Sequence, residues 1–471
     1  MIKLAENVYQ HGIYIQEEST ALVPMTQISA PPVVIGTAFK GPVNEPTLIT
    51  SYAEFVATFG TTGVWSMFTM EEVAYAFFNL YNMTPAIFIN VADPTRHKTT
   101  GTRELTGTAT PFTITDTPLI LSTLVVRSGT KTLTQGRDYK AEQDGLTTTI
   151  TVISQTNITD DKITITYSEL DATQIPAADV IGGESEVGLQ VVERVYPRLG
   201  MIPGIIIAPR FSKMPEVALA MAAKCKDING VFKSIAICDM ETAQATYYGA
   251  AYNYKTTNNL VDEFLVVCWP MVGLGDKTYY LSTHVAALMC TTDATHDQIP
   301  YESPSNKRLQ INRACLMDGT QVDLTKVEAN VLNSYGIVTA LNFAGYYRLW
   351  GNRTSIYPTS SDPKDAWIPC RRMMSWVGNT LAVNYFIRLD APITRRLVEY
   401  VLDNVGLFLN GLVSRGALLG GKIQFLQEEN PATDLADGRI KFHLSICPPA
   451  PARVIIFTLE YDVNAYAQLM S

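Results

Sequence analysis

The residues of this chain that could carry out chemistry are few and widely spaced. The five histidines, at positions 11, 97, 284, 296 and 443, form no HExxH motif and no comparable pair at i, i+4 spacing, the pattern typical of a helical zinc site. Asp293, His296 and Asp297 are the closest cluster of possible ligands. Because short polar clusters in loops are usually turn formers, we predict no metal site and no cofactor.

One segment has an enzyme-like pattern. Residues 282–287, Ser-Thr-His-Val-Ala-Ala, resemble the helix that follows the nucleophile in subtilisin-like proteases. Alignment on His284 places the nucleophile position at Tyr279, and a phenol with a pKa of about 10 does not replace a hydroxyl activated by histidine. The chain also has no GxxxxGK[ST] and no GxSxG motif. The pattern predicts a fold, and we expect no enzymatic activity.

The composition predicts that the chain hides much of its surface from water, in its own core or against other molecules. Hydrophobic residues make up 47% and charged residues only 17% of the 471 positions, against about 25% charged in an average soluble domain. A chain of this length predicts roughly three compact units. The net charge of −9 leaves no broad basic surface to neutralise phosphates, so a nucleic-acid partner is excluded.

The cysteines, the first residues and the apolar runs indicate the cellular compartment in which the chain folds. The seven cysteines form no CxxC pair, which favours reduced core thiols and a cytosolic folding compartment. The first residues meet Glu6 and polar side chains before any apolar core of a signal peptide can form. The most apolar run, residues 264–274, is about half the ~20 residues that span a bilayer. We therefore expect no stable membrane association.

Apolar strands and amphipathic helices alternate in two stretches. The first has strands at 33–36 and 86–91 and a helix at 71–80. The second follows Gly182 and Gly183 and has strands at 205–208, 234–238 and 264–268, with a helix that begins at Pro215. Continuous apolar strands are typical of a parallel sheet buried on both faces. The pattern predicts an α/β core.

The composition changes between these stretches. Residues 95–175 contain 23 threonines and no tryptophan, cysteine or methionine. Residues 162–167 alternate with period two, and Ser128-Gly129 and Asp144-Gly145 have the composition of hairpin turns. We predict a separate all-β domain inserted into the α/β unit.

The carboxy-terminal part predicts an α+β domain. Residues 394–414 are the clearest long helix, with an apolar stripe of Leu397, Val401, Val405, Phe408 and Leu412, and Gly416 beyond its end. Strands are expected near 422–426 and 439–446. The predicted divisions are an arm at 1–32, the core at 33–93 and 180–345, the inserted domain at 94–179, the carboxy-terminal domain at 346–452 and a second arm at 453–471.

Both arms are β-prone and lie beyond prolines that end the neighbouring structure. A strand outside its own domain leaves backbone groups unpaired, and pairing with the sheet edge of another copy satisfies them. The alternative is that both arms pack on their own subunit. The residues predicted to exchange between subunits are Val8, Tyr9, Ile13, Tyr14, Ile15, Val454, Ile455, Ile456, Phe457, Leu459 and Tyr461.

A series of short motifs occurs in a fixed order along the chain. They are Gly12-Ile13-Tyr14-Ile15, Val34-Ile35-Gly36-Thr37-Ala38, Gly41-Pro42, Leu199-Gly200, Pro203-Gly204, residues 284–293, Ser303-Pro304-Ser305-Asn306-Lys307, residues 341–354 and residues 412–421 with Asn430 and Gly438. In this order over some four hundred residues the chain resembles the contractile phage tail sheath proteins.

The resemblance implies a fold and an assembly. The fold is a non-catalytic, subtilisin-like α/β core with an inserted domain, a carboxy-terminal domain that faces an inner tube, and exchanged arms. The implied function is a structural subunit that polymerises helically in stacked rings and contracts to drive the tube through a cell envelope. The implied partners are other copies of the chain, the inner tail tube protein, and baseplate and tail terminator proteins, in a phage tail or bacteriocin particle.

Two further sets of residues and two other functions were considered. Trp350, Asn352 and Arg353 are predicted to form a structural junction between the core and the carboxy-terminal domain, with ordinary core packing as the alternative. Arg395, Arg396 and Glu399, at the start of the long helix, are candidates for contact with the tube. The alternative functions are a non-contractile baseplate or surface binding protein and a degenerate subtilisin-like hydrolase.

Overall fold

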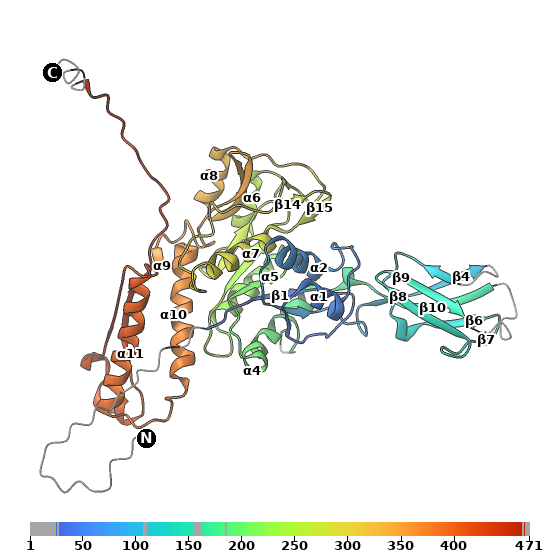
Figure 1. Cartoon of the computed structure of the whole chain (residues 1–471), viewed down its shortest axis with the longest axis horizontal. Coiled ribbons are helices and arrows are strands. Elements are labelled where there is room, and N and C mark those ends of the chain that lie inside the picture. Colours follow the sequence, from blue (N-terminus) through green and yellow to red (C-terminus); the bar gives the residue numbers. More distant parts are fainter. Residues whose placement is uncertain are drawn as a thin grey trace, which may run out of the picture.

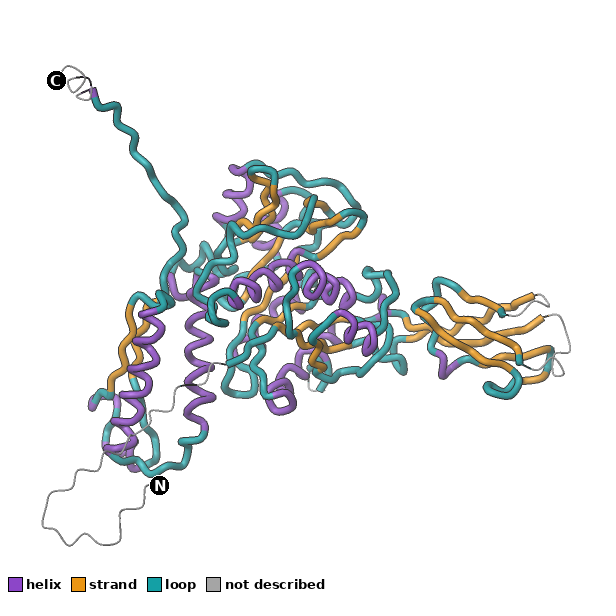
Figure 2. Tube along the Cα trace, in the orientation of Figure 1, coloured by secondary structure: helices purple, strands orange, loops and turns teal. Residues whose placement is uncertain are grey.

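Three regions of different secondary structure follow one another along the long axis of the protein (Figure 1; Figure 2). An all-β segment lies at one end, a mixed α/β body in the middle, and two long helices at the other end, from which the carboxy-terminal residues run outward. The computed structural model describes residue 25 and residues 28–106, 111–153, 162–183, 186–463 and 466. The predicted α/β body is present, with helices and strands mixed as expected.

A single large sheet runs through the middle of the body. Its order is β18(Tyr346–Trp350), β17(Ile337–Phe343), β13(Leu265–Cys268), β12(Ile235–Asp239), β11(Ile205–Ile207), β1(Pro32–Gly36), β3(Ala86–Asn90) and β2(Thr47–Ile49). The strands from β17 to β3 are mutually parallel, and β18 and β2 pair antiparallel at the two edges. Every residue of β1, β3, β11, β12 and β13 is buried.

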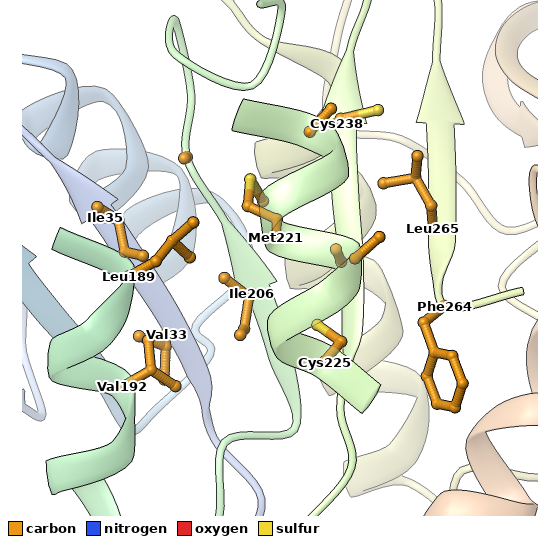
Figure 3. Packing of buried hydrophobic residues seen from close by; sticks show 14 of the residues in the cluster. Val33, Ile35, Leu189, Val192, Ile206, Met221, Cys225, Cys238, Phe264 and Leu265 are labelled. Atoms are coloured by element: carbon orange, nitrogen blue, oxygen red, sulfur yellow. The ribbon is translucent and has the colours of Figure 1, made fainter. Parts of the chain in front are cut away.

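Both faces of this sheet are covered, because alternate side chains of each strand point to opposite sides. On one face Val33, Ile206 and Leu265 pack against Met221 and other residues of a helix layer (Figure 3). On the other face Val34, Ile207 and Val266 belong to a second core cluster. The continuous apolar strands of the sequence therefore report a sheet that is buried on both sides.

The helices around the sheet follow local sequence signals. They are α1(Tyr52–Phe59), α2(Thr69–Ala74), the π-helix η1(Tyr75–Leu80), α3(Ala177–Ile181), α4(Val195–Leu199), α5(Pro215–Lys226), α6(Tyr248–Thr257), α7(Leu281–Ala294) and α8(Lys326–Ser334). Pro215 is the first residue of α5 and Val217, Met221 and Cys225 are buried on its inner face. The helix predicted at 71–80 is in fact α2 continued by η1. A small sheet of β15(Lys277–Tyr279), β14(Met271–Leu274) and β16(Arg313–Cys315) lies beside them.

The threonine-rich segment forms two antiparallel sheets with a core of their own. One contains β4(Lys98–Thr106), β10(Lys162–Leu170), β6(Val125–Ser128) and β7(Lys131–Thr132), and the other contains β5(Phe112–Ile114), β9(Thr147–Val152) and β8(Tyr139–Asp144). Both predicted hairpin turns are present, with Gly129 and Gly145 at φ of 55°. Ile150, Ile165 and their neighbours form a separate hydrophobic cluster.

This segment leaves and re-enters the body at one place. The Asp171 backbone N–H donates to the His97 carbonyl at 3.0 Å, and the His97 ring lies 2.6 Å from an Asp179 oxygen. Beyond that point, Ala172, Ile175 and Val180 pack in the core of the large sheet. The body therefore resumes close to residue 171, several residues before the predicted limit of the insert at 179.

The carboxy-terminal region consists of α9(Pro363–Ala366), α10(Ile368–Phe386), α11(Arg395–Ser414), β19(Gly420–Gln424), α12(Ala432–Ala436) and β20(His443–Cys447). The long helix was predicted to within one residue, and its cap is the Thr394 hydroxyl, which accepts a hydrogen bond from the Leu397 N–H. The predicted domain limit at 345/346 falls in the turn between β17 and β18, which pair over five positions. The large sheet therefore continues to Trp350.

We predict that the inserted sheets can be removed without unfolding the body. Replacing residues 98–170 by a short Gly-Ser linker preserves the bond pattern at His97 and Asp171, because the two ends already meet there. The remaining protein should unfold in calorimetry within about 2 °C of the transition of the body in the full chain, a shift worth on the order of 2 kcal/mol for a body of this size. An aggregated or unfolded product would show that the two cores depend on each other.

Candidate assembly site

The last described residues leave the body as an extended, unpaired strand (Figure 1). Its apolar side chains are exposed: Val454, Ile455, Ile456, Phe457, Leu459 and Tyr461 range from 64% to 95%. Within the described chain, no backbone hydrogen bond joins residues 450–460 to another segment. Apolar surface of this extent in one stretch is characteristic of an interaction site. The five residues of the amino-terminal arm predicted to exchange, Val8, Tyr9, Ile13, Tyr14 and Ile15, lie outside the described residues.

A two-stranded sheet with two open edges precedes this strand. β19 and β20 pair over five positions and with no other strand of the described residues. One face is closed, because Gly421 packs on Leu409 of α11 and Ile423 and Leu444 contact the main core. β20 leads directly to Pro448 and the extended strand. The sequence predicted both strands but gave no sign that they stand apart from any larger sheet.

The predicted junction residues connect three parts of the chain. The indole N–H of Trp350 donates to Asn330 of α8 at 2.9 Å, and the carbonyl of Asn352 accepts from the Ile368 N–H, the first residue of α10, at 3.1 Å. The Arg353 guanidinium lies over the Trp367 ring at 3.3 Å from its centroid. These residues thus link the edge of the large sheet to the start of the helical region, and their role as a structural junction between the core and the carboxy-terminal domain stays a prediction.

A second link between body and helical region is a buried ion pair. Arg372 of α10 donates to both carboxylate oxygens of Asp293 near the end of α7, with Nη1 to Oδ1 at 3.1 Å. The two residues are at most 9% exposed. Burial works against the charge on Arg372, yet Asp293 beside it raises the pKa of the guanidinium. Adjacent basic residues are usually solvated or engaged in salt bridges. Arg371 pairs with Asp365 and Arg372 with Asp293, and both arginines are buried.

The other members of the candidate metal cluster face different partners. His296 lies against Glu302 at 2.5 Å, and Asp297 pairs with Arg415 at 3.2 Å. Asp297 and Gln298 have φ of 56° and 61°, so the chain makes a tight turn there. Each polar side chain of the cluster therefore serves the local structure between α7 and the helical region.

The residues predicted to contact a tube lie at the exposed start of α11. Arg395 is paired with Glu399 at 2.7 Å on the same helix face, and Arg396 is exposed. A cation in the first helical turn is disfavoured by the helix dipole, and Glu399 one turn later offsets that cost. Both charges point to solvent, so they are available to a partner of the helical region.

Among the described residues, one helix, α11, is long and apolar enough to cross a bilayer by length and composition. In this structure 28% of its apolar window is buried. The sequence had given no such segment. Its apolar stripe has another use here, because Val401, Val405, Leu409 and Leu412 are buried against the rest of the helical region. The same helix also contains three polar or charged residues, Glu399, Asp403 and Asn404.

The enzyme-like segment at the start of α7 is sealed. The Ser282 hydroxyl donates to Asp239 at 2.5 Å, and the Ser282 N–H donates to the same carboxylate at 2.9 Å. His284 turns instead to the Tyr81 hydroxyl at 3.0 Å from Nδ1, and burial lowers its pKa to about 3. Ser282 and His284 are both fully buried. Ser282 is bonded to a carboxylate and not to a histidine, and it is closed off from a substrate, so the arrangement does not activate it as a nucleophile.

Two buried carboxylates hold the amino terminus of α7. Asp239 ends β12, and Glu72 of α2 accepts from the Tyr280 N–H at 2.7 Å. Burial raises the pKa of Asp239 to about 6, although hydrogen bonds from Ser282 and Ser212 oppose the shift. Burial likewise raises the pKa of Glu72 well above its usual range. The helix end is thus capped by acids whose ionised forms are disfavoured.

The comparisons with known proteins agree on one kind of particle. No protein-family model matches the chain. The tail sheath protein of Burkholderia phage BcepMu is 28% identical over 483 residues, which cover 96% of each chain. The sheath of the PVC extracellular contractile injection system in its contracted state has a TM-score of 0.59 at 13% identity, covering 98% of this chain and all of that one. The contracted helical sheath of the anti-feeding prophage has a TM-score of 0.59 at 14% identity, covering 96% and 99%.

We expect that removing one partner of the Asp293–Arg372 pair destabilises the fold, whereas replacing both partners by apolar residues does so much less. R372M leaves a buried carboxylate without a partner and should lower the free energy of unfolding by about 3–5 kcal/mol. The double variant D293L/R372M should recover most of that loss. Chemical denaturation of the unassembled subunit measures both. Equal losses in the single and double variants would mean that packing, and not charge pairing, decides stability here.

The Asp239 carboxyl makes stability depend on pH. Its folded pKa lies above the unfolded value of about 3.9, so its stabilising contribution is complete below pH 4 and is lost as the pH rises through about 6. Relative to D239N, the wild-type protein should lose roughly 3 kcal/mol between pH 4 and pH 7. Denaturation at both pH values tests this. D318N removes an exposed acid whose pKa is lowered by hydrogen bonds from Thr320 and keeps Asp239, so it should lose about as much stability as the wild-type protein between the two pH values.

Proposed function

Because this chain belongs to the contractile tail sheath proteins, we propose that it polymerises helically around an inner tube and contracts to drive that tube through a cell envelope. The relative with 96% coverage is a tail sheath protein, and the solved structures of the same fold include sheaths in the contracted state. The chain acts mechanically. Its chemistry is that of its surfaces, and no reaction is assigned to it.

The carboxy-terminal strand is the observation that carries this function. Six apolar side chains exposed by 64–95% are unfavourable in a free subunit, and full burial of a large apolar side chain contributes about 1.5–3 kcal/mol. Even after the cost of ordering the strand, burial against another copy favours association. The exposed backbone groups of residues 450–460 add a second reason to pair.

The β19–β20 sheet fits the role of acceptor. Both of its edges are open among the described residues, and one face is already covered by α11. An extended strand from one neighbouring copy can add to each edge by backbone hydrogen bonding, a mode that depends little on side-chain identity. We assign Val454, Ile455, Ile456, Phe457, Leu459 and Tyr461, and the amino-terminal residues Val8, Tyr9, Ile13, Tyr14 and Ile15, to this exchange.

Contraction then needs no nucleotide. An extended lattice is metastable if sliding of the subunits increases the area buried between them. At about 25 cal/mol per Å², a few hundred additional Å² per subunit release several kcal/mol, and each copy in the tail contributes. The exchanged strands keep neighbours attached during this movement, because the chain can bend at Pro448 and Pro449 without breaking the pairing.

The rest of the molecule has corresponding roles in this proposal. The α/β body, residues 33–97 and 171–350, is a subtilisin-like core that has no catalytic role. Its contacts through Trp350, Asn352, Arg353 and the Asp293–Arg372 pair transmit force to the helical region. The start of α11, with Arg395, Arg396 and Glu399, contacts the inner tail tube protein. Baseplate and tail terminator proteins bind the ends of the polymer in the tail of a phage or bacteriocin particle.

Truncation of either arm tests the proposal. A chain ending at residue 452, and one lacking residues 1–20, should both give a soluble subunit whose unfolding transition is unchanged, because neither removes a buried core residue of the described chain. Neither should form the striated hollow cylinders that the full chain forms in negative-stain electron microscopy. A matched chain in which residues 98–170 are replaced by a linker should still polymerise. Cylinders formed by the arm-deleted chains would contradict strand exchange.

A further inference from the structure

A groove lies where the carboxy-terminal strand leaves the body. One wall is the loop of residues 301–307 with α8, the floor is the segment 350–357, and the other wall is the root of the extended strand, residues 449–455. The groove has a cavity volume of about 960 Å³, enough for several side chains of a second polypeptide. Tyr301, Trp350 and Tyr357 supply its apolar surface.

The charge of the groove is opposite to that of the chain. Lys307, Lys326, Arg353 and Arg453 line it, and Glu302 is its one carboxylate. Glu302 is already engaged, because it pairs with Lys307 and His296. No ion pair with an acid of the described residues is found for the other three cations. A protein with a net charge of −9 thus concentrates uncompensated positive charge in one groove.

The two arginines make this imbalance acute. The Arg353 guanidinium is held between the rings of Trp367 and Tyr357, at 3.3 Å and 4.4 Å from their centroids, and its Nη1 is buried without a hydrogen-bond acceptor. Burial lowers the pKa of Arg353, and the neighbouring positive charge of Arg453 lowers it further. A half-buried cation with an unpaired buried N–H group, beside a like charge, is costly unless an acceptor such as a carboxylate is supplied.

One wall of the groove can also pair with a strand. Among the described residues, the backbone from Ala450 to Ile455 donates and accepts no backbone hydrogen bond, and this stretch is extended. An incoming extended segment can therefore bond to the wall through its backbone and direct carboxylates across the groove to Lys326 and Arg353. Nucleic acid fits less well, because the net charge of the chain, −9, opposes the approach of a polyanion.

We infer that this groove binds an acidic, extended segment of a second copy of this chain, which supplies the missing carboxylate to Arg353 and Arg453. The inference rests on the proposed polymerisation and adds a second, electrostatic contact beside strand exchange on the β19–β20 sheet. The charges that destabilise the free subunit become favourable in the polymer. The cations of such a subunit lack acidic partners when the subunit is alone and gain them from neighbouring subunits in the polymer.

The test uses two substitutions on opposite walls, R453Q and K326Q, in the full chain. Arg453 and Lys326 are exposed, and Lys326 is the first residue of α8, where the helix dipole disfavours a cation. Each free subunit should therefore unfold at the same temperature as wild type or a higher one. The polymers should dissociate at an NaCl concentration at least twofold lower, measured by turbidity and electron microscopy.

R439Q is the matched control, because Arg439 is an exposed arginine of the same region already paired with Asp434 and Asp437. Its polymer should dissociate at the wild-type salt concentration. R453Q and K326Q polymers that match R439Q would overturn the inference, while failure of the wild-type chain to form cylinders would refute polymerisation itself. Stabilisation of the wild-type subunit by inorganic phosphate, lost in R453Q with an unchanged polymer, would also overturn the inference and identify an anion site.

Discussion

The fold depends on a parallel sheet that is buried on both faces. Strands β1, β11, β12 and β13 expose no side chain, because two separate clusters of apolar residues cover them. Such a sheet is a stiff body, since interiors packed to native density deform little under load. The other regions are attached to this body at two places: the inserted sheets at His97 and Asp171, and the helical region after Trp350.

Two kinds of contact join this stiff body to the helical region. Arg353 stacks on Trp367 at the start of α10, and Arg372 of the same helix pairs with Asp293 from α7. Both links are polar groups in largely buried surroundings, where geometry is more restrictive than in apolar packing. If the helical region moves relative to the sheet, these contacts must either break or pull the contacting residues of the body along. They therefore favour motion of the body and helical region as one unit, with bending left to the proline-rich root of the strand.

Much of the body could be predicted from the sequence. The apolar strands, the helix that begins at Pro215, the two hairpin turns and the long helix capped by Thr394 each leave a local pattern within a few residues. Sheet order, the separation of β19 and β20 from other strands, and the pairing of Asp293 with Arg372 depend on residues far apart in the chain, and no local pattern encodes them. The same reason explains why the Arg371-Arg372 pair gave no sign of its burial.

The candidate site was predictable in part for similar reasons. The extended carboxy-terminal strand could be expected because β-prone residues follow three prolines. The cationic groove could not, since Lys326, Arg353 and Arg453 come from three separate segments. Ser282 and His284 illustrate the opposite error. Their spacing resembles a catalytic helix, yet the side chains face Asp239 and Tyr81 on different sides of the helix.

The two-strand stem at His97 and Asp171 has a consequence for how such proteins diversify. Because the inserted sheets have an interior of their own and meet the body where one backbone bond closes the loop, substitutions in them leave the packing of the large sheet unchanged. The inserted sheets can then accumulate changes rapidly under selection of their own, while the large sheet beneath them is inherited intact.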